Sequence, residues 1–251
     1  MTNATASSAI LSHLHRADGS ATFSQNGYTV IGAVNGPIEV QRRDELPVEA
    51  AIDVIVRPAA GVGGTRERHL ESILQSTLRQ IILIHNFPRT LIQVTLQITN
   101  TPEDKVAGSK IVQASSHLAI LPTLLQTALL ALLSASMPLS VIFTSVLIAA
   151  HKDGAITSLT PNPSLVGFES ADSVHVLAFT LEGKLLLAES QGTFTLDDWD
   201  NILEMAGSVC VPKDGADIEG GVRIEETKED MTTFVKCTLE AKVAQDLHWY
   251  T

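Results

Sequence analysis

The chain has 251 residues, 45% of them hydrophobic, and a mean hydropathy of +0.19, so it can bury a sizeable core and is not globally disordered. The formal net charge is −11, but residues 1–90 are neutral because eight arginines balance eight carboxylates. This distribution argues against nucleic-acid binding over the whole surface and leaves open a local arginine-lined path in the first ninety residues.

The two cysteines and the N-terminal residues indicate the cellular compartment in which the chain is expected to fold. Cys210 and Cys237 have no metal-ligand spacing and predict no disulfide framework, so a reducing compartment is expected. The first fifteen residues contain no basic segment followed by an apolar run, so no secretory signal is predicted. Residues 1–9 are small and polar and predict a flexible N-terminal tail.

Residues 18–37 predict a β-hairpin. Asn26-Gly27 is a tight-turn dipeptide, because both residues tolerate positive φ, and it lies between predicted strands that include residues 22–24 and 28–34. Asn35-Gly36-Pro37 is expected to end the second strand.

Two strands and a helix follow the hairpin. Residues 50–57 favour a strand, and residues 91–99 alternate between apolar and polar side chains, which is typical of a half-buried strand. Between them, the glycine-rich segment 59–65 leads to a helix predicted over 66–85, with Thr65 as its expected cap.

Residues 111–150 contain no Asp, Glu, Lys or Arg, so a membrane span has to be considered. Pro122 and Gln126 interrupt the apolar run, and Pro138 breaks it. The favoured interpretation is a core helix over about 118–135 followed by a buried strand over 140–150, and a membrane anchor is the alternative.

The last hundred residues predict further strands and two helices. A turn is expected at 151–154, strands at 173–180 and 184–188, a helix capped near Thr195 that runs to about 211, and a final helix at 228–247. An acidic, glycine-rich exposed loop is expected at about 212–226. The alternation of strands and helices predicts a mixed α/β or α+β domain without internal repeats.

Several segments in a fixed order resemble motifs of the RNase PH family. The segments that carry the resemblance are the hairpin with its Gly36-Pro37-Ile38-Glu39 end, Arg66 with its helix, Pro88-Arg89 before a strand, the alanine-rich run 128–132, and Ala171-Asp172. Together they span roughly residues 18–210. Segments 36–39, 42–47, 56–59 and 65–67 look most like the smallest RNase-PH-like ring subunit of the eukaryotic RNA exosome.

The resemblance implies a fold, partners and a location. The expected fold is a single RNase PH-like domain over residues 10–251, similar to domain 2 of ribosomal protein S5. The expected partners are other RNase-PH-like ring subunits, S1/KH cap subunits, an RNase-II-like nuclease subunit and RNA passing through the ring channel. The expected location is the nucleus, nucleolus and cytoplasm, with no membrane attachment and no cofactor.

Active members of the family phosphorolyse RNA from its 3′ end. They use an arginine to hold phosphate and two carboxylates for a metal or a leaving-group proton. Counting along the motifs, the arginine position falls on Leu121 and the carboxylate positions fall on Thr160 and Val166, and residues 154–168 contain no Asp or Glu. The resemblance therefore implies a non-catalytic ring subunit that supports RNA processing and degradation.

Four arginines are candidates for RNA binding. Arg66 matches a family arginine that helps to bind RNA or phosphate, and Arg42, Arg43 and Arg89 are weaker candidates. The alternative for each is a solvated surface side chain, and for Arg66 this alternative is equally weighted.

The alternative function is an RNase PH-like nuclease with residual phosphorolytic activity, or with metal-dependent hydrolytic activity through Asp153 or Asp172. No zinc motif, phosphate loop or catalytic triad is recognisable in the sequence, and no metal site is predicted.

Overall fold

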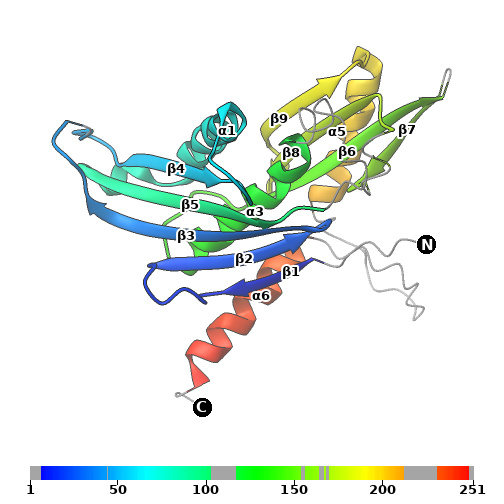
Figure 1. The fold of residues 1–251 in the computed structure, drawn as a ribbon. Coiled ribbons are helices and arrows are strands. Elements are labelled where there is room, and N and C mark those ends of the chain that lie inside the picture. Colours follow the sequence, from blue (N-terminus) through cyan, green and yellow to red (C-terminus); the bar gives the residue numbers. More distant parts are fainter. Residues whose placement is uncertain are drawn as a thin grey trace.

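Two β-sheets lie on opposite sides of the apolar helix α3 (His117–Ser134) and form the body of the protein (Figure 1). The fold is taken from a computed structural model. The model describes residues 7–43, 45–102, 117–153, 156–163, 167, 170–211 and 231–248. Helix α3 contacts strands of both sheets, so its side chains are enclosed by the rest of the fold.

The first sheet has five strands in the order β1-β2-β3-β5-β4. The strands are β1 (Ser8–Leu11), β2 (Gly19–Gln25), β3 (Tyr28–Glu39), β4 (Ala51–Arg57) and β5 (Thr90–Asn100). Neighbours are antiparallel except for β4 and β5, which are parallel. Burial alternates along β3, β4 and β5, so one face packs against α3 and α1 (Thr65–Ile81), and no helix of the described residues covers the other face.

The predicted hairpin is present as β2 and β3. Asn26 and Gly27 have φ values of +51° and +81°, as a tight two-residue turn requires. The expected end of the second strand at Asn35-Gly36-Pro37 is wrong, because β3 continues to Glu39 across a register shift between Asn35 and Ile38.

Other predicted boundaries also need correction. Ser8 and Ala9 were assigned to the flexible tail but belong to β1, which pairs with β2, so a tail over 1–9 is too long. Helix α1 ends at Ile81 instead of residue 85 and is followed by the short 3-10 helix η1 (Ile84–Asn86). The predicted turn at 151–154 is wrong, because β6 continues to Asp153.

The second sheet has four antiparallel strands in the order β7-β6-β8-β9. They are β6 (Phe143–Asp153), β7 (Ile156–Pro161), β8 (Ser173–Thr180) and β9 (Leu185–Gly192). Every residue of β8 is buried, because α3 covers one face of the sheet and α5 (Leu196–Cys210) covers the other. The short strand β7 was not predicted from the sequence.

Helix α3 confirms the core-helix interpretation of the uncharged run. Its residues 118–132 are all buried, and Gly32 on β3 lets it approach closely, since a Cβ there would lie 2.8 Å from the Thr127 methyl group. No helix among the described residues is long and apolar enough to cross a membrane. The final helix α6 (Met231–Asp246) packs on the first sheet, with the rings of Phe23 and Phe234 6.0 Å apart. The expected acidic loop at 212–226 lies outside the described residues.

Candidate RNA-binding surface and phosphate site

The first turn of α1 carries Arg66, the strongest RNA-binding candidate of the sequence. Gly64 is the N-cap, and its N–H donates a hydrogen bond of 2.6 Å to the Glu67 carboxylate. The expected Thr65 cap is therefore wrong, because Glu67 at the third helical position reaches back to the free N–H. Arg66 is exposed and forms no ion pair with another described residue.

A surface hollow of about 650 Å³ lies between the glycine-rich loop and β4. Arg57 and Arg68 line it together with Asp53, Glu67 and Glu71, and Arg68 is paired with Glu71 at 3.6 Å. Three carboxylates outnumber two guanidinium groups there, so the hollow has no net positive charge. By itself it does not favour a phosphate group.

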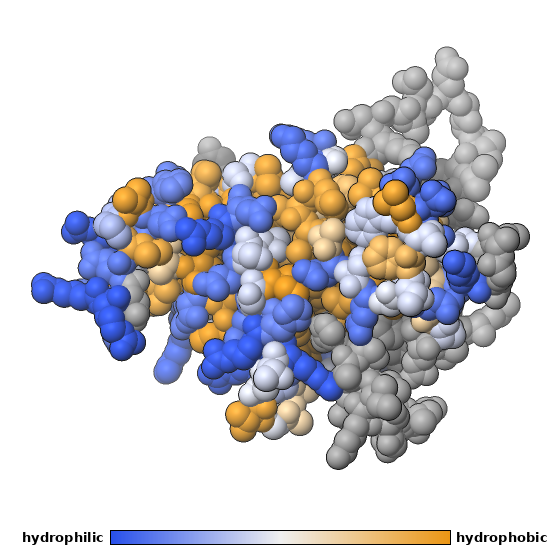
Figure 2. Space-filling view, turned by 90° about the horizontal axis from the view of Figure 1, so that it is seen from above, coloured by the Kyte–Doolittle hydropathy of each residue, from blue (hydrophilic) through white to orange (hydrophobic). Residues whose placement is uncertain are grey.

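The other three arginine candidates lie at the opposite end of the first sheet. Arg42 and Arg43 are exposed in the connection between β3 and β4, where hydrophilic side chains project from the end of the molecule (Figure 2). Arg89 directly precedes β5, and its guanidinium lies 3.3 Å from the Glu45 carboxylate. This ion pair partly neutralises Arg89.

Strand β5 separates the two groups of arginines. Its first residue pairs with Glu39 of β3, and Gln97 near its other end pairs with Arg57, which precedes the loop that leads to α1. Seven residues of strand span about 20 Å. The structure therefore groups Arg42, Arg43 and Arg89 loosely at one end and places Arg66 at the other.

The positions assigned to the phosphate and carboxylate sites carry no charge where the structure describes them. Leu121 is fully buried in the core on α3. Thr160 lies on β7 and its hydroxyl donates a hydrogen bond of 3.3 Å to the Ala149 carbonyl. Val166 lies outside the described residues. A buried leucine offers phosphate neither a positive charge nor a hydrogen-bond donor.

The carboxylates named for metal-dependent chemistry are not clustered in the described part of the chain. Asp172 accepts a hydrogen bond of 2.8 Å from the backbone N–H of Lys152. The Asp153 side chain lies outside the description. Among the described residues, no group of three or more His, Cys, Asp or Glu side chains could hold a metal ion.

Asp198 links the start of α5 to β7. Its carboxylate accepts hydrogen bonds from Thr157 Oγ1 at 2.6 Å and from Thr195 Oγ1 at 2.7 Å. Hydrogen bonds from Thr157 and then from Thr195 lower the pKa of Asp198 to about 2. The helix cap near Thr195 was predicted from the sequence, whereas the contact between Asp198 and β7 was not.

His175 is a buried polar side chain of β8 that the sequence analysis missed. Its Nδ1 lies 2.8 Å from Ser190 Oγ and its Nε2 lies 2.9 Å from Ser173 Oγ, so both ring nitrogens have hydrogen-bond partners. Burial lowers the pKa of His175, and the Asp198 carboxylate opposes this shift. The sequence signal that could have identified His175 as buried is its position between two valines in an apolar strand. With both nitrogens occupied, the ring has a structural role.

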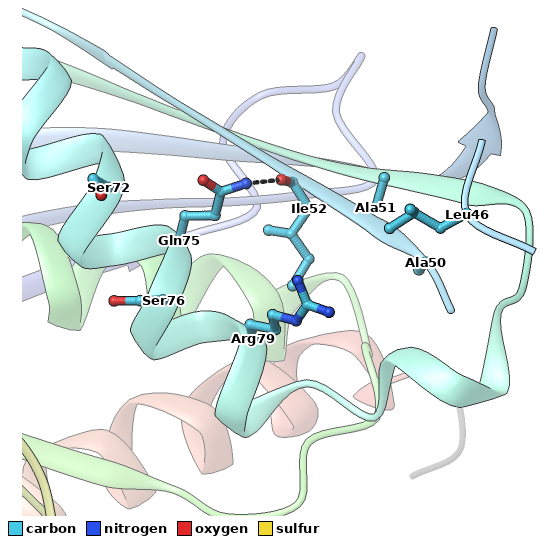
Figure 3. A pocket seen from close by; sticks show the side chains of 8 residues that line it. All are labelled: Leu46, Ala50, Ala51, Ile52, Ser72, Gln75, Ser76 and Arg79. Atoms are coloured by element: carbon cyan, nitrogen blue, oxygen red, sulfur yellow. Dashed lines mark hydrogen bonds between the residues drawn. The ribbon is translucent and has the colours of Figure 1, made fainter. Parts of the chain in front are cut away.

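Side chains of α1 occupy the open edge of β4. Gln75 Nε2 donates a hydrogen bond of 2.7 Å to the Ile52 carbonyl (Figure 3), and the Val56 N–H donates one of 2.9 Å to Glu71. A hollow of about 360 Å³ lies beside the first of these bonds and is lined by apolar residues as well as polar ones. Its lining is Leu46, Ala50, Ala51, Ile52, Ser72, Gln75, Ser76 and Arg79.

Comparison with known proteins agrees with this fold. Residues 7–138 match the RNase PH model of the 3′ exoribonuclease family, domain 1. The exosome complex component RRP46 of Saccharomyces cerevisiae is 37% identical over 80% of this chain and 87% of its own length. Its Schizosaccharomyces pombe counterpart is 32% identical over 77% and 79%.

A solved structure of an Rrp46 protein also resembles this chain. The crystal structure of rice Rrp46 superposes with a TM-score of 0.68 at 25% identity and covers 81% of this chain and 89% of that one. The family model spans the first sheet, α1 and α3, and the relatives extend the match across most of the chain. The chain therefore belongs to the RNase PH family of 3′ exoribonuclease domains.

Proposed function

We propose that the chain is a non-catalytic ring subunit of an RNA exosome and supports 3′-to-5′ RNA processing and degradation by forming part of the channel that RNA enters. The observation that carries this proposal is the similarity, over most of both chains, to proteins named exosome complex component RRP46. The absence of catalysis is supported by Leu121, which is buried and apolar at the position where the resemblance puts the phosphate-binding arginine.

The physical reason for the lost activity is electrostatic. Phosphorolysis brings an attacking phosphate next to a backbone phosphate, and the two negative charges repel each other unless a fixed cation neutralises them. Thr160 adds a hydroxyl group that is bonded to a backbone carbonyl, where the resemblance expects a carboxylate. Activity of the complex would then reside in another subunit.

The proposed partners are other RNase-PH-like ring subunits, S1/KH cap subunits, an RNase-II-like nuclease and RNA in the channel. The proposed location is the nucleus, including the nucleolus, and the cytoplasm. These assignments rest on the names of the relatives and on the family resemblance.

For direct RNA contact we assign Arg66 the main role. It is exposed and has no ion-pair partner among the described residues, whereas Arg89 is paired with Glu45. Arg42 and Arg43 lie at the same end as Arg89 and are the second candidates. Replacing Arg66 with Glu should reduce cross-linking of this subunit to channel RNA at least tenfold, and Arg68→Glu on the same helix is the matched control.

Two measurements test the proposed function. The full chain is co-expressed with the other ring subunits of its organism, and it is expected to co-elute with them at the size of the ring. The pure chain is then incubated with 3′-labelled RNA, with phosphate and separately with Mg²⁺, and no shortening is expected. A chain that always elutes alone would refute the ring assignment, and robust shortening abolished by Asp172→Asn would establish the nuclease instead.

A further inference from the structure

The two sheets have four edge strands, and three of them are protected. Strand β4 is covered by the Glu71 and Gln75 side chains, and β1 is only four residues long. Strand β7 ends at Pro161 and is linked to α5 through the bond between Thr157 and Asp198. Strand β9 has eight residues, contains neither proline nor lysine, and is the remaining edge. Natural proteins seldom leave such an edge free.

The backbone pattern shows which groups of β9 point outward. The Thr193 N–H donates to the Asp172 carbonyl, and the Thr180 N–H donates to the Lys184 carbonyl, so even-numbered residues of β8 bond toward β9. In this register Glu189 is in a hydrogen-bonded pair with β8, whereas Ala188 and Ser190 are not. The N–H and C=O groups of Ala188 and Ser190 therefore point away from β8, and they have no backbone partner among the described residues.

The side chains along this edge leave room for another strand. Ala188 and Ser190 are small and exposed, and Glu189 is the only charged residue of β9. Leu185 at its start is 44% exposed. By contrast, the helix beside the β4 edge carries several charged side chains that would meet an incoming strand.

We propose that the free edge of β9 binds an extended strand of a different exosome subunit and so continues the four-stranded sheet. Unpaired main-chain donors and acceptors at a strand edge are complementary to another strand. The identity of the partner rests on the proposed function. A second copy of this chain fits less well, because pairing Ala188 with Ser190 of that copy would set the two Glu189 side chains opposite each other.

The test replaces Ala188 in the full chain, co-expressed with the other ring subunits. Ala188→Pro removes the outward N–H but no bond to β8, and Ala188→Ser is the matched control that keeps the N–H. Recovery of the assembled ring is expected to fall at least tenfold for Ala188→Pro and to be unchanged for Ala188→Ser. Ala188→Lys, which keeps the backbone and adds a charge at the edge, should also reduce assembly and serves if the proline variant does not fold.

Hydrogen exchange gives an independent readout on the unmodified chain. The Ala188 and Ser190 amides are expected to exchange at least tenfold more slowly in the ring than in the isolated chain. Ala188→Pro and Ala188→Lys variants that assemble normally, or amides that gain no protection, would overturn strand addition and leave the proposed function standing. A dimer of this chain alone that Ala188→Pro disrupts would also overturn it. A wild-type chain that never joins a ring would instead refute the proposed function.

Discussion

Strands β4 and β9 are both edge strands, but their outward backbone groups differ in whether they have hydrogen-bond partners. At β4 the Ile52 carbonyl accepts a hydrogen bond from Gln75 of α1 (Figure 3). The Val56 N–H of the same strand donates a hydrogen bond to Glu71 of α1. At β9 the outward groups of Ala188 and Ser190 have no backbone hydrogen-bond partner among the described residues. Both strands have the same need for hydrogen bonds, so the difference lies in what packs beside them. The protein closes one edge from within and leaves the other to water or to a partner.

The largest expected effect tests the backbone pattern of β9. Glu189→Pro removes an N–H that bonds to β8, so it should lower the free energy of unfolding by about 3 kcal/mol or more. Ala188→Pro removes an outward N–H and should cost about 1 kcal/mol or less. Urea unfolding of both variants measures the difference. Equal losses would show that the pairing pattern has been assigned wrongly.

Opening the β4 edge should have the next largest effect. Replacing Glu71 and Gln75 together with Ala leaves a backbone N–H and a carbonyl without partners, so we expect a loss of about 2–3 kcal/mol. The variant should also self-associate, because unpaired backbone groups at an opened strand edge can bond to the same edge of a second copy. Urea unfolding and light scattering measure both effects. Ser72→Ala on the same helix is the control, and a double variant as stable and monomeric as this control would contradict the prediction.

A third prediction concerns polar groups that neither water nor a partner reaches. Both side-chain polar atoms of Gln126 on α3 are buried without a hydrogen bond to any described residue. Outward groups on β9 can bond to water, but a buried amide cannot, so Gln126→Leu should raise the free energy of unfolding by about 1 kcal/mol. Thermal unfolding measures the change. Destabilisation by more than about 1 kcal/mol would indicate that the amide has an important partner.

The smallest effect concerns His175, which bonds to Ser190 of β9. Its folded-state pKa lies below the usual value of 6.5. The contribution of His175 to the free energy of unfolding is therefore fully present above pH 6.5, and it is lost as the pH drops from there toward the lowered pKa. The cause is that the unfolded chain gains the proton more readily than the buried ring does. Unfolding curves at pH 7.5, 6.5 and 5.5 should therefore show a loss that is smaller in His175→Gln. If the free energy of unfolding changed equally with pH in the wild-type chain and in His175→Gln, His175 would be excluded as the cause of the loss.

Local sequence patterns predicted most strands and helices. The Asn26-Gly27 turn, the alternation over residues 91–99 and the uncharged run after residue 111 each reflect a preference that neighbouring residues express on their own. Element ends were less predictable: β3 passes through Gly36-Pro37, and α1 ends four residues early at Ile81. Such ends depend on pairing with distant strands, which no local pattern contains.

The sequence by itself determined the order of most elements, with β1 and β7 as the exceptions. It also determined the apolar character of α3 and the absence of a charge at Leu121. The tertiary structure decided that Arg66 lies apart from Arg42, Arg43 and Arg89, because β5 spans the distance between them. It also decided which edges are closed. Hydrogen-bond partners such as Glu71 and Val56, fifteen residues apart in the chain, meet only when the helix packs on the sheet. Edge exposure is a property of that packing and not of either strand's sequence.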